Sequence, residues 1–135
     1  MNLNPDGPHS PERTGEAGQL FDDCSRFLVY ATMSEKHGLA YPANAYRLIA
    51  DFYAATSRLP QACEQIGQFL EAQGRRDDAY DARGRDPRQQ AGHAAGQLAR
   101  ASAALHAATA ALQAAQTAIA GLGIYEDEGG EGDHG

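Results

Sequence analysis

The sequence predicts an all-α, four-helix bundle-like domain that ends in a long, alanine-rich helix. Three segments before residue 74 carry apolar residues at helical spacing, and prolines that follow turn-forming residues mark new helix starts. A seven-residue repeat of larger apolar side chains then runs through an alanine-rich segment near the C-terminus. At 135 residues the chain is long enough to form one domain whose core needs no disulfide or metal.

Residues 1–18 are expected to be mostly flexible. Three prolines and three glycines stand among polar residues there, so the segment buries too little apolar surface to offset its ordering entropy. Ser10 followed by Pro11 nevertheless has the N-cap and first-position proline of a helix, so the first helix is allowed to begin early and to fray at Gly15 and Gly18. No basic start followed by an apolar stretch is present, which argues against a secretory signal peptide.

The secure part of the first helix is predicted over residues 19–34. Its apolar residues follow the spacing of one helical face, namely Leu20, Cys24, Phe27, Leu28 and Ala31. The pair His37 and Gly38 then supplies a stop signal.

Residues 42–57 and 60–73 are predicted to form the second and third helices. Each begins with a proline, Pro42 or Pro60, where the first N–H of a helix is unpaired in any case. The helix over 42–57 has two adjacent apolar rows and is therefore expected to be central. Two short helices joined by a turn also match a helix-turn-helix, which makes a DNA-binding regulator the alternative function. Glu64 and the absence of lysine and arginine at the start of the would-be recognition helix argue against it.

Residues 74–88 carry five arginines interleaved with four aspartates. Because the charges nearly cancel, we predict a solvated connector or polar helix extension with local ion pairs. A contact with an anion or a nucleic acid is the weaker alternative, since it favours unopposed arginines.

The fourth helix is predicted over residues 87–121, from an N-cap at Asp86 to a terminal glycine at position 121 or 123. Its seam is one row of larger apolar side chains, which we predict to be the interaction residues: Leu98, Leu105, Leu112 and Ile119. An alanine stands three positions after each leucine of this row. A weakly polar flank beside the seam contains Ala95, Ser102, Thr109 and Gln116.

The predicted fourth helix is about 50 Å long, whereas each of the other three is about 23 Å long. No single one of them covers it, so either two helices stack along it or a second chain does. Arg100 is the only charged residue from 89 to 125, and parallel zippers normally carry charge pairs beside the seam. Packing within a bundle, or an antiparallel alanine-type coil, is therefore favoured over a parallel zipper.

The formal net charge is −7, and five of the acids lie in the last ten residues. Segment 124–135 is predicted to be a flexible, solubilising acidic tail, with docking on a basic protein surface or mimicry of nucleic acid as alternatives. The remainder is nearly neutral and has no basic stripe, which disfavours nucleic-acid binding. Polar side chains interrupt the uncharged stretch 101–125, so we expect no membrane span.

No catalytic, cofactor-binding or metal-binding residue is predicted, and no small-molecule ligand is inferred. The five histidines share no ligand spacing with one another or with the two cysteines. Phosphate-binding, dinucleotide-binding and nucleophile-elbow motifs are absent from the sequence. Cys24 and Cys63 are expected to be reduced core thiols of a cytoplasmic protein.

The arginine-rich, lysine-poor and alanine-rich composition and two short phrases, YAATSRLPQ at 53–61 and AGLG at 120–123, resemble small, uncharacterised helical proteins of high-GC actinobacteria. Some of those proteins are associated with mobile elements. The resemblance covers few residues and implies no activity or site. The chain departs from the helical-hairpin secretion substrates of that phylum, because it has no tryptophan for their Trp-x-Gly turn.

The sequence therefore predicts a non-enzymatic interaction or accessory protein that self-associates or binds another protein through the seam. A helix-turn-helix regulator or an accessory protein of DNA transfer is the alternative.

Overall fold

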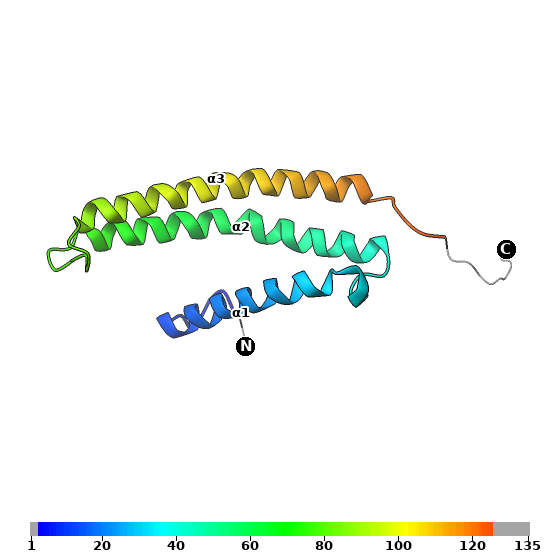
Figure 1. Ribbon diagram of the computed structural model, residues 1–135, viewed down its shortest axis with the longest axis horizontal. Helices are drawn as coiled ribbons and strands as arrows, with labels where there is room; N and C mark the ends of the chain where they lie inside the picture. Colours follow the sequence, from blue (N-terminus) through cyan, green and yellow to red (C-terminus); the bar gives the residue numbers. More distant parts are fainter. Residues whose placement is uncertain (1–2, 126–135) are drawn as a thin grey trace. The chain divides into compact units, whose positions relative to one another are not determined.

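The computed structural model describes residues 3–125, and every regular element within this range is helical (Figure 1). The helices are α1 (Pro11–Ala31), the short 3-10 helix η1 (Ser34–Lys36), α2 (Pro42–Gly74) and α3 (Pro87–Ile119). The chain divides between Tyr41 and Pro42 into two compact units, one with α1 and η1 and the other with α2 and α3. The all-α prediction is confirmed, whereas the four predicted α-helices are three.

The first unit begins its helix earlier than expected, because the cap at Ser10 is used. The backbone N–H of Arg13 donates to Ser10 Oγ over 3.1 Å, and Pro11 occupies the first turn. The expectation of a mostly flexible segment 1–18 is therefore wrong for its second half, which is helical. Gly15 and Gly18 lie inside α1 without breaking it, since the cap and 21 helical residues offset a cost of about 1 kcal/mol for each glycine.

α1 ends at Ala31 rather than at the predicted residue 34. Its C-cap is Thr32, whose backbone N–H and side-chain hydroxyl both donate to Leu28 O, at 3.0 and 2.8 Å. The stop signal lies after η1, where His37 adopts a left-handed conformation with φ of 58°. No residue of α1 is buried.

α2 is one continuous helix of 33 residues, so the predicted break between helices over 42–57 and 60–73 is wrong. Pro60 lies inside it and is one of its two buried residues. An interior proline costs about 3 kcal/mol, because a backbone hydrogen bond is lost and the ring crowds the preceding turn. The neighbours Leu59, Ala62 and Cys63 are also partly buried, so packing along this stretch outweighs the local penalty.

α3 agrees with its prediction to within two residues at its end. Asp86 is the N-cap and accepts the backbone N–H of Arg88 over 3.1 Å, with Pro87 in the first turn. The helix runs for 33 residues to Ile119, so it matches α2 in length.

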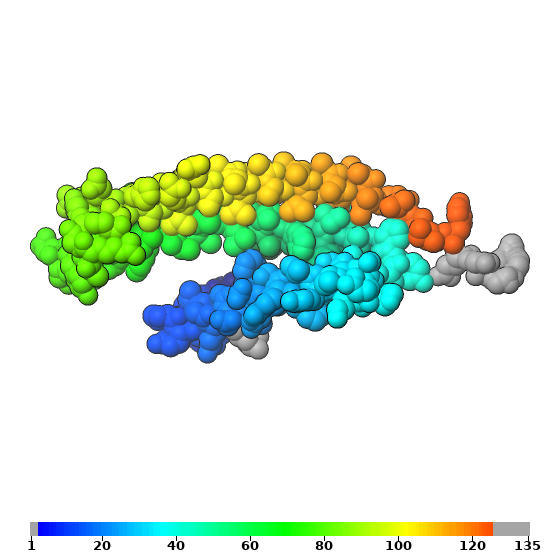
Figure 2. Space-filling view, viewed as in Figure 1, coloured from blue at the N-terminus to red at the C-terminus, as the bar shows by residue number. Residues whose placement is uncertain are grey.

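α2 and α3 form an antiparallel hairpin and lie side by side along their whole length (Figures 1 and 2). Two glycines of α2, seven residues apart, allow the close approach. A Cβ added at Gly67 would lie 3.4 Å from both Cα and Cβ of Ala95, and one added at Gly74 would lie 2.7 Å from Cβ of Ala91. The two helices are thus in contact partly through backbone and methyl groups.

The connector between α2 and α3 contains the local ion pairs that its sequence predicts. Arg76 binds both carboxylate oxygens of Asp78 at 2.9 Å, and Arg85 binds Asp81 at 3.0 and 3.1 Å. These pairs join residues of the connector to one another.

Candidate interaction surface

The four predicted seam residues share one side of α3. Leu98, Leu105, Leu112 and Ile119 are all partly buried, and none is fully buried. The alanines at 94, 101 and 108 beside them are also partly buried. Each seam side chain is thus partly covered within a single chain and partly accessible to solvent.

The row expected to be a weakly polar flank lies directly against α2. Ser102 is 4% exposed and its hydroxyl donates to Glu64 Oε2 over 2.9 Å. Thr109 donates to Thr56 Oγ1 over 2.8 Å, one heptad further along. Small residues in this row therefore meet α2 more closely than the leucines do.

These contacts identify two edges of the hairpin. Glu64 and Ile66 are two positions apart on α2 and so point roughly 160° away from each other. Because Glu64 meets Ser102 at one edge, Ile66 and the residues seven and fourteen positions before it lie at the other. On α3, the leucine row and its alanines lie on that same side of Ser102.

This second edge is an apolar face, and we use that name for the following residues: Phe52, Leu59 and Ile66 of α2, with Ala94, Leu98, Ala101, Leu105, Ala108, Leu112, Ala115 and Ile119 of α3. Phe52 is 39% exposed and Ile66 50% exposed. Phe69, one turn beyond Ile66, is 60% exposed. No aliphatic or aromatic side chain among residues 3–125 is fully buried, so the hairpin alone leaves its apolar face accessible to solvent.

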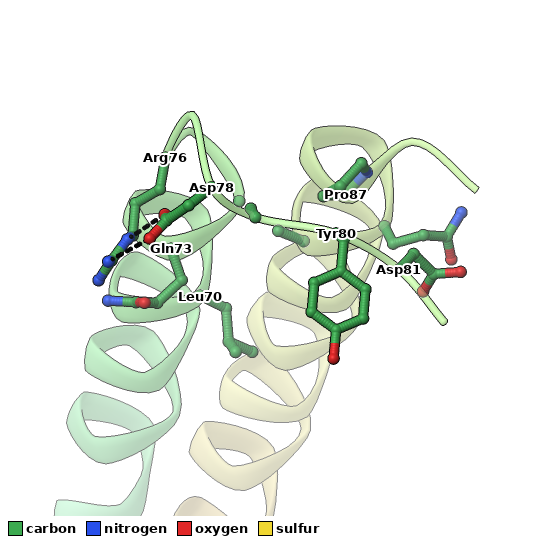
Figure 3. Close-up of a pocket in the computed structure, with 11 residues that line it drawn as sticks. Leu70, Gln73, Arg76, Asp78, Tyr80, Asp81 and Pro87 are labelled. Carbon is green, nitrogen blue, oxygen red and sulfur yellow. Dashed lines mark hydrogen bonds and ion pairs between the residues drawn. The ribbon is translucent and has the colours of Figure 1, made fainter. Parts of the chain in front are cut away.

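A concave site lies at the connector end of the hairpin (Figure 3). It has a volume of about 400 Å3 and is lined by eleven residues, among them Leu70, Gln73, Tyr80 and Pro87. Arg76 and Asp78 lie at its rim and bind each other through two hydrogen bonds, so neither charge is directed at a ligand. Tyr80 is 85% exposed. No nucleophile paired with a base lines this site, and it supports no catalytic assignment.

Asp81 is held as a carboxylate by its neighbours in the connector. The Arg85 guanidinium and the backbone N–H groups of Arg83 and Arg85 all donate to it, and together they lower the pKa of Asp81 to about 2, with the Arg85 side chain as the largest cause. The same pair raises the pKa of Arg85. In the other pair, Arg76 lowers the pKa of Asp78.

We expect the carboxyl group of Asp81 to titrate near pH 2 in the folded protein. A depressed folded pKa adds stability that is fully present above the unfolded value of about 3.9 and is lost as pH falls through about 2. Arg85→Ala should raise the pKa of Asp81 toward that ordinary value. Carboxyl chemical shifts followed by NMR between pH 5 and pH 1.5 test this, and an unchanged titration in Arg85→Ala contradicts it.

The hydroxyl pair of Thr56 and Thr109 should contribute a measurable coupling energy. We expect Thr56→Val and Thr109→Val each to lower the free energy of unfolding by about 1 kcal/mol, and the double variant to be about as stable as either single one. Urea unfolding of the four proteins gives this cycle. Strictly additive effects would show that the hydrogen bond adds no stability.

The cysteines, the possible metal ligands and the hydropathy of the helices can also be compared with the sequence predictions. Cys24 is exposed on α1, so its prediction as a core thiol is wrong, because α1 buries no residue; Cys63 is partly buried, and both are free thiols. Among residues 3–125, no three His, Cys, Asp or Glu side chains are grouped in a way that could hold a metal ion. No helix within that range is both long enough and apolar enough to cross a bilayer.

The structure bears on one of two further hypotheses from the sequence, the helix-turn-helix, and leaves the other, the acidic tail, mostly outside the described residues. The helix-turn-helix alternative required a turn near residues 57–60, and α2 is helical throughout that stretch. The predicted acidic tail, 124–135, lies almost wholly outside the described residues.

Comparison of the chain with protein-family models, with curated proteins and with solved structures gave no match.

Proposed function

We propose that this chain is a non-enzymatic helical interaction module that self-associates through the apolar face of its α2–α3 hairpin. One observation carries the proposal: the face runs along both long helices, yet no aliphatic or aromatic side chain in the described range is fully buried. A folded domain is stabilised mainly by removing apolar surface from water, at roughly 25 cal/mol per Å2. A two-helix hairpin removes only part of its apolar surface from water, so covering its remaining face adds a large further stabilisation.

The absence of paired chemical groups in the described residues supports a binding role over a catalytic one. The hydroxyls of Ser102, Thr56 and Thr109 bond across the interface or to backbone carbonyls. The exposed side chains of the hairpin include large apolar and aromatic ones, which is the chemistry enriched in the centres of protein interfaces.

Ile66→Glu tests this proposal at a side chain that is 50% exposed in the single chain. We expect the parent protein to sediment as an oligomer and Ile66→Glu to sediment as a monomer with unchanged helicity. Gln65→Glu is the matched control: it adds the same charge one position away, on an exposed side of α2. A parent protein that is monomeric at all concentrations, or equal dissociation of both variants, contradicts the proposed function.

A further inference from the structure

We infer that α2 contains a hinge at Pro60, about which its first half, residues 42–59, swings away from α3 while its second half, residues 61–74, stays in place. Two hydrogen bonds to α3, made by Thr56 and Glu64, hold the hinge closed in the structure, and we call them the clasps. The inference concerns the hairpin of a single chain and goes beyond the proposed self-association.

Pro60 interrupts the backbone hydrogen bonds of α2 at one point. Proline has no N–H, so the carbonyl of Thr56 lacks the donor that another residue type at position 60 would supply. The ring also crowds the preceding turn, which makes interior prolines a usual site of helix bending. The only proline of α3 is Pro87 in its first turn, so no proline interrupts its ladder. α2 is therefore the helix of the hairpin that is built to bend.

The two clasps lie at equal distances from Pro60 along the sequence. Thr56, four residues before it, accepts from the hydroxyl of Thr109 over 2.8 Å. Glu64, four residues after it, accepts from the hydroxyl of Ser102 over 2.9 Å. Each half of α2 is thus joined to α3 about one turn from the hinge, and both bonds end on one uninterrupted stretch of α3.

The row of α2 that contains Pro60 changes its side chains at the hinge. After Pro60, at seven-residue spacing, come Gly67 and Gly74, where an added Cβ would lie 3.4 Å and 2.7 Å from the nearest atoms of α3. Before Pro60 the same row carries Tyr53 and Tyr46, and a tyrosine ring does not allow backbones to approach that closely. The second half is packed tightly on α3 and is also joined to it by the connector, so the first half is the one that swings.

Opening of the hinge uncovers apolar surface at the end of the hairpin opposite the connector. Ile49 and Tyr53 of α2 are partly buried, as are Leu112 and Ile119 of α3. Because the helices are antiparallel and Thr109 meets Thr56, residues after 109 lie beside residues before 56. A swing of residues 42–59 therefore makes part of the hairpin interior accessible to a partner while the swinging half remains helical.

Hydrogen exchange of the full chain, followed residue by residue by NMR, distinguishes a hinge from fraying of the helix end. A swing breaks the backbone bonds that cross the hinge, which residues 61–63 donate to residues 57–59, and preserves those within the first half. We expect the amides of 61–63 to exchange about tenfold faster than those of 50–57 and of 64–70. Fraying would instead give rates that decrease steadily inward from the start of α2.

Three variants connect this exchange to the proline and to a clasp, with rates taken relative to residues 64–70. Pro60→Ala supplies the missing N–H and should slow the exchange of 61–63 by about tenfold. Thr109→Val removes one clasp and should speed that exchange about three- to tenfold in the parent, but not in Pro60→Ala. Thr117→Val is the matched control, because Thr117 is exposed on the same helix, and should have no effect.

The parent protein alone is able to contradict the inference. Amides of 61–63 that exchange no faster than their neighbours overturn it without any variant, and so does a steady gradient from the start of α2. An effect of Thr109→Val that is the same with and without Pro60 also overturns it, since this hydrogen bond then stabilises the hairpin as a whole and not the hinge.

Discussion

Replacing Leu105 and Leu112 together by aspartate is expected to unfold the α2–α3 hairpin. Both leucines are partly buried beside the row that contacts α2, and each substitution removes apolar burial and places a carboxylate next to that interface. A fully buried leucine contributes about 1.5–3 kcal/mol, and desolvating a charge adds to the loss. The pair should lower the free energy of unfolding by roughly 4–6 kcal/mol, which is comparable to the whole stability of a small domain. Circular dichroism during heating and in urea measures the change.

The matched control for this double substitution is Ala103→Asp with Ala110→Asp. Both alanines are exposed on α3 and have the same seven-residue spacing, so the control adds the same charge to the same helix without entering the interface. We expect it to change stability by less than about 1 kcal/mol. The leucine row is not the packing seam if Leu105→Asp with Leu112→Asp leaves helicity, melting and sedimentation at the level of the control.

Gly67→Leu is expected to destabilise the α2–α3 hairpin strongly. Gly67 is buried, and an added Cβ would already lie 3.4 Å from both Cα and Cβ of Ala95. A methyl group therefore fits at this point, but the further three carbons of leucine require α3 to move away along several turns. Overpacking of this kind costs about 1–3 kcal/mol and more when backbones must separate. We expect a loss of about 3 kcal/mol in the free energy of unfolding.

Gly96→Leu is the control because it makes the same chemical change where an added Cβ meets no atom within 4 Å. Glycine is about 1 kcal/mol less favourable than leucine in a helix interior, so this variant should be stabilised by up to that amount. Chemical denaturation of both variants gives the difference directly. Equal effects at the two positions would show that the close approach at Ala95 does not constrain the hairpin.

The helix ends were predictable where side chains act locally. Asp86 and Pro87 mark the start of α3 by a cap and a fixed φ, which depend on a few adjacent residues and not on the fold. Ser10 and Pro11 carry the same local signal at the start of α1, but the predicted start at residue 19 did not use it. At Pro60 the proline is misleading as a start signal, because no capping side chain directly precedes it and it is buried inside a continuous helix.

The seam was predictable as a pattern but not in its orientation. The heptad identified Leu98 and its repeats as packing residues, and they are partly buried. It did not show that the neighbouring row with Ser102 and Thr109 is the one in direct contact with α2. The sequence does contain a matching signal: Gly67 and Gly74 repeat at seven residues on α2, as the small side chains do on α3. Pairing these two repeats requires knowing that the helices are antiparallel neighbours.

The two polar contacts across the hairpin have a consequence for its alignment. Because α3 repeats leucine and alanine at the same positions in successive heptads, sliding it along α2 by seven residues, about 10 Å, places similar side chains on similar side chains again. Apolar packing alone therefore leaves several alignments nearly degenerate in energy. Ser102 with Glu64 and Thr109 with Thr56 are satisfied together in one alignment only. These two polar contacts therefore select one alignment of α3 along α2. A hairpin without them would be compact and helical but free to shift between neighbouring alignments.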